Sequence, residues 1–279
     1  MTAGRVGILL CVVAFLLTLV SAAWQRLSGP SAPRRGSFEA GGADHRFRLP
    51  RTAITGRDLR VAVPDPGNGA AGEIRYRRWP TEDPLTVVPL ARGDGALAVD
   101  LPTQPAAGKL QYHILLTVRG QEVRVPADPA RDPIVRFRGA VSPAILVPHI
   151  ALMFLAVFFG LLAGLEAAFR PKGMRRSTWA ALVTMTLGGL LFGPLVQKAA
   201  FGAYWTGFPF GHDLTDNKIL FMWFAWVGAV IALRSLPAGR IRIRRVVVLA
   251  AAILMFGVYL IPHSTWGSEL DWKKHDASS

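Results

Sequence analysis

Three of the six histidines in this 279-residue chain lie at the ends of apolar segments or between two of them. Neutral imidazoles and carboxylates are ligands for zinc, and two imidazoles from facing helices can bind haem iron. Polar groups at membrane depth are costly, so their presence favours a functional role. We therefore predict that a metal ion or haem would bind, if anywhere, at the outer face of the membrane that these helices span. The candidate residues are His149, His212, Asp213, Asp216 and His263.

Four other polar residues are weaker candidates. Three of them belong to the same predicted face, namely Lys218, Glu269 and Asp271. The fourth, Glu166, lies near the opposite end of its apolar segment. It could act as a proton-relay carboxylate, or it could reach the membrane interface beside Arg170, one helical turn away.

A purely structural role for the same residues competes with the binding site. None of the histidines has a compact ligand spacing such as His-x-x-x-His. Asp213 or Thr215 could cap the helix that follows, and Asp216 would lie against its positive N-terminal end. Polar contacts of Asp216 to Lys218 could also fix the preceding loop, Gln197 to Lys218, against the last helix and the tail. That loop is rich in aromatic residues, which suits the headgroup layer of a membrane.

Several enzyme classes lack their signatures here. The sequence contains no Walker loop, no dinucleotide-binding glycine pattern, no His-Glu-x-x-His and no Gly-x-Ser-x-Gly. Cys11 is the only cysteine, so neither an intramolecular disulfide nor a thiolate zinc site can form. These features favour a protein that is not an enzyme.

Five apolar segments must position the candidate residues. They are Gly7 to Ala23, Ala144 to Phe169, Trp179 to Val196, Ile219 to Leu233 and Val246 to Ile261. A helix needs roughly 17 to 25 apolar residues to span a bilayer. The last two segments are short on this measure. We expect the fourth to gain a turn from Thr215–Lys218 and the fifth to gain one from Pro262 and His263.

The first segment has two interpretations. Arg5, an apolar run and the small residues before Trp24 resemble a signal peptide. The run is longer than a usual signal core, so we favour a retained anchor with Trp24 at the interface. The chain is then a multi-pass α-helical membrane protein of five helices, or of four after signal cleavage.

Charge predicts which way the chain faces. Its 32 Lys and Arg against 18 Asp and Glu give a net charge of +14, which in a soluble protein would suggest nucleic acid. Ten of these basic residues fall on one side if the five segments alternate: Arg5, Arg170, Lys172, Arg175, Arg176, Arg234, Arg240, Arg242, Arg244 and Arg245. The positive-inside rule places this side, with the N-terminus, in the cytoplasm. Residues 25–143 and the C-terminal tail are then outside, with the lipid bilayer and no nucleic acid as partner.

The exported region reads as β-structure. Apolar residues alternate with polar ones at Leu59–Val63, Ile74–Tyr76 and Leu110–Val118, and turn-forming residues separate these runs. About seven short strands in this length predict an all-β sandwich. We divide the chain into a signal anchor or signal peptide (1–24), a linker (25–37), an extracytoplasmic β-sandwich (38–138), a four-helix transmembrane domain (143–263) and an extracytoplasmic tail (264–279).

Two resemblances accompany this organisation. The stretch from Leu101-Pro102 to Tyr112 resembles the approach to a late strand in immunoglobulin-like and fibronectin-type modules, a resemblance of fold alone. The strings GPLVQK, FGAYWTGFPFGHDLTDNK and IPHSTWGSELD resemble tracts of uncharacterised bacterial inner-membrane proteins. The second resemblance implies the same membrane and architecture and no activity.

Three functions follow from these features. The leading hypothesis is a non-enzymatic inner-membrane protein whose exported sandwich binds an envelope partner or assists assembly. The first alternative is a redox or metal protein with haem or a metal ion at the outer membrane face. The second alternative is a small transporter, which the lack of paired charges within the membrane disfavours.

Overall fold

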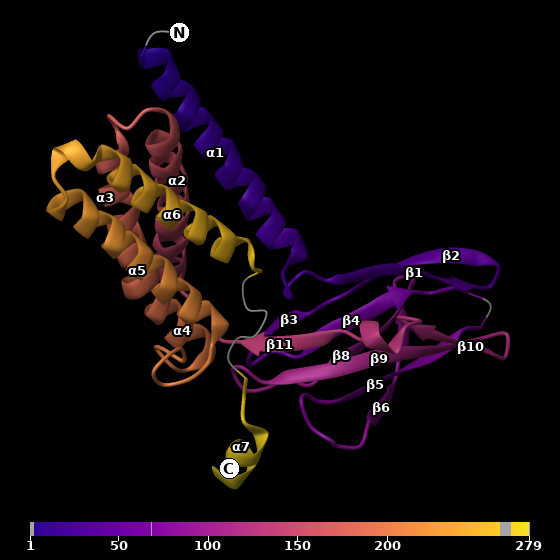
Figure 1. Cartoon of the computed structure of the whole chain (residues 1–279). Helices are drawn as coiled ribbons and strands as arrows, with labels where there is room; N and C mark the ends of the chain where they lie inside the picture. Colours follow the sequence, from indigo (N-terminus) through magenta and orange to yellow (C-terminus); the bar gives the residue numbers. More distant parts are fainter. Residues whose placement is uncertain (1–2, 68, 263–268, 279) are drawn as a thin grey trace. The chain divides into compact units, whose positions relative to one another are not determined.

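The computed structural model describes residues 3–67, 69–262 and 269–278. The chain forms two compact units (Figure 1). The helical unit comprises Met1–Gly29 and Val141–Gly267, and the β unit comprises Pro30–Ala140 and Ser268–Ser279. Each unit therefore draws on two separate parts of the sequence, and the C-terminal tail belongs to the β unit.

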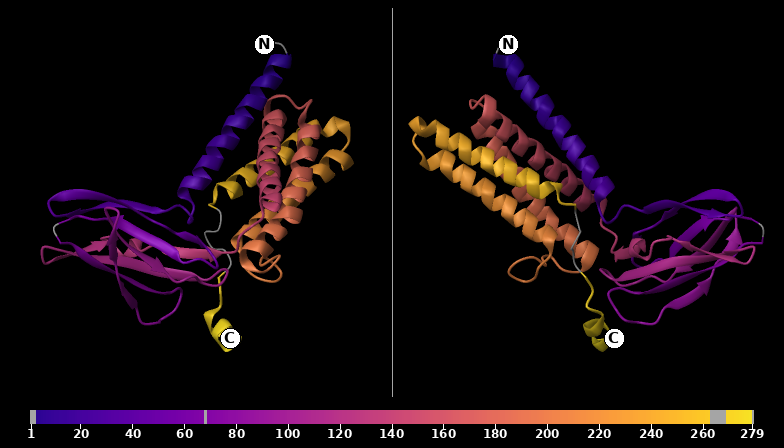
Figure 2. Two further views of the ribbon diagram at one scale, coloured as in Figure 1. Left: turned by 180° about the vertical axis from the view of Figure 1, so that it is seen from behind. Right: turned by 45° about the vertical axis from the view of Figure 1, so that its right-hand side comes forward.

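The helical unit contains helices that match the five apolar segments (Figure 2). They are α1 (Ala3–Ser28), α2 (Pro143–Phe169), α3 (Met174–Met185), α4 (Gly193–Phe201), α5 (Leu214–Ser235) and α6 (Ile241–Leu260). A π-helical turn, Thr186–Phe192, joins α3 and α4 into one rod. Within the described residues, five helices are thus long and apolar enough to cross a membrane, which makes the chain a candidate multi-span membrane protein.

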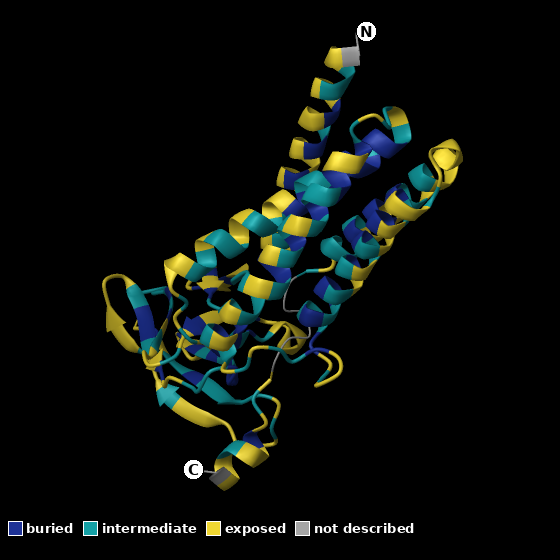
Figure 3. Cartoon of the chain, turned by 90° about the vertical axis from the view of Figure 1, so that its left-hand side faces the viewer, coloured by how far each residue is buried: buried dark blue, intermediate teal, exposed yellow. Residues whose placement is uncertain are grey.

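Small residues bring these helices together. On α1, Ala14, Thr18 and Ser21 are buried along one face, and exposed apolar residues occupy the rest of the helix (Figure 3). A side chain at Gly160 or Gly164 of α2 would collide with residues of α6. Such close approaches favour association where the surrounding solvent is itself apolar, because packing rather than water exclusion then holds helices together.

Arginines of α6 close two helix ends. Arg245 donates from its Nε and Nη2 atoms to the carbonyls of Ala167 and Ala168 at the end of α2, both at 2.6 Å. Arg244 donates to the carbonyls of Leu233 and Leu236 at the end of α5, at 2.8 and 2.5 Å. The final carbonyls of a helix lack partners within it and carry its negative end, so a cation there satisfies both needs.

The β unit consists of three open antiparallel or mixed sheets. The first pairs β1 (Arg34–Ala40) with β2 (Ala43–Leu49). The second has the order β3-β11-β9-β5-β6, with β10 also paired to β9; its strands are β3 (Thr52–Ile54), β5 (Ala71–Arg78), β6 (Thr86–Pro89), β9 (Lys109–Val118), β10 (Gln121–Val125) and β11 (Ile134–Arg138). The third has the order β4-β8-β7, with β4 (Leu59–Pro64), β7 (Ala91–Gly93) and β8 (Ala96–Leu101). One cluster of buried side chains draws on all three sheets.

The predicted alternation is confirmed where it was clearest. On β9, all the even-numbered residues from Leu110 to Val118 are buried, and Val61 and Val63 of β4 are buried as well. The described residues form eleven strands rather than about seven, because several are only three or four residues long and leave no readable period. The sheets are open, and a closed sandwich or immunoglobulin fold is not confirmed.

Some predicted boundaries change. The fourth apolar segment gains its extra turn as expected, since α5 begins at Leu214. The extra turn expected for the fifth segment was wrong at Pro262, because α6 ends at Leu260. The helix instead begins earlier, at Ile241, and so includes the arginines that cap neighbouring helices. The predicted linker at 25–37 overlaps the end of α1 and the beginning of β1. His263 lies outside the described residues.

Candidate functional site

The predicted site centres on the loop between α4 and α5. Gly202, with φ of 87°, ends α4 in the left-handed conformation that glycine adopts without strain. Asp213 immediately precedes α5, and its Oδ1 accepts a hydrogen bond from the Thr215 amide at 2.7 Å. The capping role predicted for Asp213 is thus confirmed.

Asp216 organises this loop through one carboxylate oxygen. Its Oδ2 accepts hydrogen bonds from the backbone amides of Thr206 at 2.7 Å and Gly207 at 3.0 Å. The side-chain amide of Gln197 on α4 donates to the same oxygen at 3.0 Å, and the Thr206 hydroxyl lies 3.4 Å from it. Asp216 is only 6% exposed, so these donors replace the water that a carboxylate would otherwise bind.

The residues around Asp216 leave no room for larger side chains. A Cβ atom at Gly207 would lie 2.6 Å from the Cβ of Asp216 and 2.8 Å from the Oδ1 of Asn217. That same Oδ1 accepts from the Phe208 amide at 2.7 Å, and Gln197 also donates to the Thr206 hydroxyl at 2.6 Å. The Asp216 cluster, defined as Gln197, Thr206, Gly207, Asp213 and Asp216, is therefore internally satisfied.

Lys218 lies one turn away from Asp213 but faces another helix end. Its side chain is 5% exposed, and its Nζ donates to the Ile261 carbonyl just after α6. Trp24 and Gln25 of α1 donate to the Leu260 and Ile261 carbonyls at 3.3 and 3.1 Å. These three side chains cap the C-terminal end of α6 as the arginines cap the ends of α2 and α5.

The histidines do not join the Asp216 cluster in the described structure. The Nδ1 of His149 lies 2.8 Å from the Gly188 carbonyl, within the π-helical turn between α3 and α4. Gly188 is buried, and a Cβ there would meet the backbone of α2. His149 thus joins α2 to the π turn. His212 is exposed at the end of the loop, and His263 lies outside the described residues.

The structure therefore brings together Asp213 and Asp216 and keeps His149 apart. Among residues 3–67, 69–262 and 269–278, no group of three or more histidine, cysteine or acidic side chains is arranged to hold a metal ion. The chemistry of the Asp216 cluster is that of a carboxylate surrounded by donors, which stabilises a loop conformation.

Glu166 is buried within the helical unit. It is 8% exposed, and its Oε2 accepts a hydrogen bond from the Ser177 hydroxyl of α3 at 2.6 Å. Its carboxyl group fills the space above Gly173, where a Cβ would lie 2.6 Å from the carboxyl carbon. The glutamate thus joins the end of α2 to the start of α3. Arg170, its predicted neighbour, extends instead toward Gly7 of α1.

The two acidic tail candidates belong to the β unit. Glu269 forms an ion pair with Lys109 at the start of β9. Asp271 accepts from the amide of Lys274 at 3.3 Å, and its carboxylate lies 3.8 Å from the Lys274 Nζ. Glu269 therefore joins the tail to β9, whereas these contacts of Asp271 lie within the tail itself.

Sequence reasoning missed the partners of Asp216. Gln197 and Thr206 are neutral polar residues 19 and 10 positions before it, a separation that no local pattern links. The one available signal was that Gln197 precedes an aromatic, glycine-rich loop whose amides need partners, and that Thr206 belongs to this loop.

Comparison of the chain with protein-family models, with curated proteins and with solved structures finds no match in any of the three.

Proposed function

We propose that this chain is a five-span inner-membrane protein that presents its β unit outside the cytoplasm and binds a partner there without catalysing a reaction. The observation that carries the proposal is that residues 30–140 and 268–279 form one compact unit. The four spans between these two stretches must therefore return the chain to the side from which it left. An even number of crossings does so, which supports spanning by α2, the α3–α4 rod, α5 and α6.

Charge supports the orientation of this arrangement. Arg244 and Arg245, which cap the ends of α2 and α5, lie at the end of the helical unit opposite to the Asp216 cluster, since they belong to the start of α6 and Lys218 contacts its end. Arginine-rich ends face the cytoplasm by the positive-inside rule. This orientation makes the N-terminus cytoplasmic. The resemblance of the loop and tail tracts to bacterial inner-membrane proteins supports the inner membrane as the location.

The packing of α1 supports a retained anchor. Its buried residues Leu10, Ala14, Thr18 and Ser21 recur at helical spacing and form a seam against the other helices. A signal peptide removed after export has no need of such a seam.

Binding through the β unit fits its construction. The three sheets share one buried core, which favours the layered, sandwich-like packing that immunoglobulin-like modules use for recognition. The candidate site in the helical unit, by contrast, is occupied by its own loop. The exposed apolar side chains Leu85 and Val87, 45% and 49% exposed beside and on β6, are the first positions to test for contact.

Labelling in intact cells tests the topology. In a Cys11→Ser background, a cysteine at Glu122 of β10 and one at Lys274 of the tail should react with a membrane-impermeant maleimide. A cysteine at Gly239, before α6, should react only after permeabilisation. Opposite accessibility of positions 122 and 274 would overturn the five-span arrangement.

Crosslinking tests the binding function. A photoreactive amino acid at Val87 should give one discrete adduct in intact cells, and the same group at Asp44, an exposed residue of β2, serves as the matched control. Identical, diffuse labelling from both positions would argue against a specific partner at β6.

A further inference from the structure

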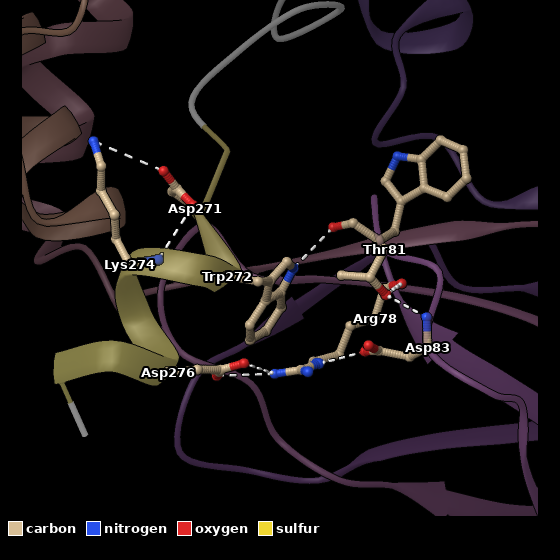
Figure 4. Close-up of polar contacts among 8 residues, drawn as sticks. Arg78, Thr81, Asp83, Asp271, Trp272, Lys274 and Asp276 are labelled. Carbon is tan, nitrogen blue, oxygen red and sulfur yellow. Dashed lines mark hydrogen bonds and ion pairs between the residues drawn. The ribbon is translucent and has the colours of Figure 1, made fainter.

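The C-terminal tail docks on the β unit through one buried aromatic side chain. Trp272 is 7% exposed, and its indole Nε1 donates to the Trp79 carbonyl at 3.1 Å (Figure 4). A Cβ atom at Gly108 would lie 3.3 Å from the Cη2 of this indole, so the ring packs against bare backbone. The Leu270 amide also donates to the Ala107 carbonyl at 3.3 Å. The tail thus adds a side chain and a main-chain contact to the β unit.

Arg78 recognises the tail from one side. Its guanidinium lies 5.0 Å from the Trp272 ring centroid, and its Nη1 donates to both carboxylate oxygens of Asp276, at 2.9 and 2.8 Å. The Nε of Arg78 donates to Asp83 at 2.6 Å, as Figure 4 shows. This hydrogen bond holds the pKa of Asp83 below its ordinary value. Because Asp83 belongs to the β unit itself, Arg78 keeps a partner that does not depend on the tail.

Lys109 recognises the tail from the other side. The residue is 9% exposed, and its Nζ pairs with Glu269. Burial lowers the pKa of Lys109, the hydrogen bond that Lys109 donates to Glu269 opposes that shift, and the positive charge of Arg136 adds to it. A buried ammonium beside another cation is stabilised by a carboxylate in contact with it. The surface of the β unit around Lys109 therefore favours an acidic residue at the position that Glu269 occupies.

We propose that this surface is a peptide-binding site for acidic segments that carry a tryptophan, and that the chain's own residues 269–278 are its ligand in cis. We define it as the tail site: Arg78, Trp79, Asp83, Gly108 and Lys109. The ligand pattern is an acid three positions before the tryptophan and an acid four positions after it. Trp272 and Asp276 share one face of α7 (Trp272–Ser278), as residues four apart on a helix do.

The tail site is built without the tail. The Trp79 amide donates to the Lys109 carbonyl at 2.9 Å, and the Phe137 amide donates to the Gly108 carbonyl at 2.9 Å. Together with the Arg78–Asp83 pair, these contacts fix the recognition groups within the β unit. One aromatic anchor with charged contacts around it is the usual composition of a peptide-recognition surface. A short segment held by a few contacts can leave such a surface while the sheets remain folded.

Peptide binding to the full chain in lipid nanodiscs tests the proposal. The probe is a fluorescent peptide of residues 269–279, and the receptors are the intact chain and a chain that ends at residue 268. The truncated chain should bind the peptide, and the intact chain should bind it about tenfold or more weakly, because its own tail competes at high effective concentration. A peptide with Trp272→Ala should fail to bind the truncated chain.

Matched variants locate the binding to the tail site. In the truncated chain, Arg78→Met should weaken binding about tenfold, whereas Arg75→Met, on the same strand and paired with Glu73, should leave it unchanged. A full-length Trp272→Ala chain provides a second receptor that keeps every other residue, and it should bind the wild-type peptide. The proposal is overturned if folded receptors bind no peptide, or if intact and truncated chains bind it equally.

Discussion

The loop of residues 202–213 and the tail of residues 269–278, which includes α7, are both short segments held on a compact unit, by opposite arrangements. At the loop, the carboxylate of Asp216 on α5 is central, and three aromatic side chains of the loop are exposed: Tyr204, Phe208 and Phe210 are 57%, 69% and 83% exposed. In the tail, the indole of Trp272 is central and the carboxylates surround it. A carboxylate is thus at the centre of the first arrangement and aromatic side chains are outside, whereas the second has an aromatic side chain at the centre and carboxylates around it.

The backbone explains the inversion. The amides of Phe208, Phe210, Gly211 and Asp213 all find partners within the loop or on α5, as do those that Asp216 binds. The loop joins two helices that can cross a membrane, and aromatic side chains are frequent at membrane interfaces. An apolar environment offers the backbone no hydrogen bonds, so a segment that meets it must satisfy its amides internally.

The tail meets a different requirement. It docks on a β unit whose own sheets already satisfy most of their amides, so burial of one large apolar side chain contributes most and the charged pairs add selectivity. A buried carboxylate thus stabilises a segment by accepting hydrogen bonds from backbone amides. A buried indole does so because its apolar surface is removed from water. The two arrangements should respond differently to the same kinds of change.

Removal of the central carboxylate should have the largest effect. Asp216→Ala leaves the Thr206 and Gly207 amides and the Gln197 side chain without their acceptor, which we expect to cost about 3 to 5 kcal/mol of local stability. Hydrogen exchange in nanodiscs should then accelerate at Thr206 and Gly207 and remain unchanged across β9. Asp216→Asn keeps one carbonyl oxygen, so its exchange rates at Thr206 and Gly207 should lie between those of Asp216→Ala and the wild type.

A loop that keeps its protection in Asp216→Ala would contradict the role of the carboxylate. The exposed Asp44→Asn change in β2 controls for the loss of a negative charge, and it should alter neither region.

Removal of the central indole should have the next largest effect. Trp272→Ala should cost the docked tail about 2 to 3 kcal/mol, the scale of burying one large apolar side chain. Exchange should accelerate at the Leu270 amide, which donates to Ala107, while the Asp216 loop keeps its protection. Lys273→Ala, at an exposed neighbour, is the control. Equal destabilisation by both substitutions would show that the indole is not the anchor.

The sequence predicts features that depend on neighbouring residues better than features that depend on distant ones. Apolar length and alternation are local properties, so the five long helices and the clearest strands, β4, β5 and β9, are readable from the chain. The Asp213 cap is readable too, because its acceptor and donor are two residues apart. The candidate residues of the metal or haem site share a predicted depth in the membrane, and a common depth alone does not bring side chains into contact.

What the sequence does not reveal depends on distant pairs. Trp272 and Arg78 are nearly two hundred positions apart, and a single tryptophan in a polar tail predicts neither burial nor a partner. Likewise, the π turn that accepts from His149 has no signature in helix periodicity. The tail was therefore predicted only as an extracytoplasmic extension, whereas the structure makes its residues part of the β unit.

A second buried carboxylate, that of Glu166, tests whether the number of hydrogen-bond donors sets the cost of removing the charge. Glu166 accepts one hydrogen bond, from Ser177, where Asp216 accepts several. Glu166→Gln keeps the shape and an acceptor oxygen, so we expect it to lower the free energy of unfolding by about 1 kcal/mol or less. Thermal unfolding in detergent measures this, with Glu122→Gln on exposed β10 as the control. A loss as large as that of Asp216→Ala would mean that burial rather than donor number sets the cost.

Acid tests whether Arg78 is held in place by the β unit. Because Arg78 donates to Asp83, the pKa of Asp83 is lower in the folded protein than in the unfolded chain. The unfolded chain therefore binds the proton first, and the stabilisation is present above about pH 4 and is lost as the pH falls through the lowered pKa. The difference in unfolding free energy between the wild type and Asp83→Asn should be under about 1 kcal/mol at pH 7, as for other partly exposed pairs, and should vanish in acid. A difference that does not decrease as the pH falls below about 4 would mean that Asp83 stabilises the β unit through contacts other than its charge. The tail site would then depend on the tail itself to orient Arg78.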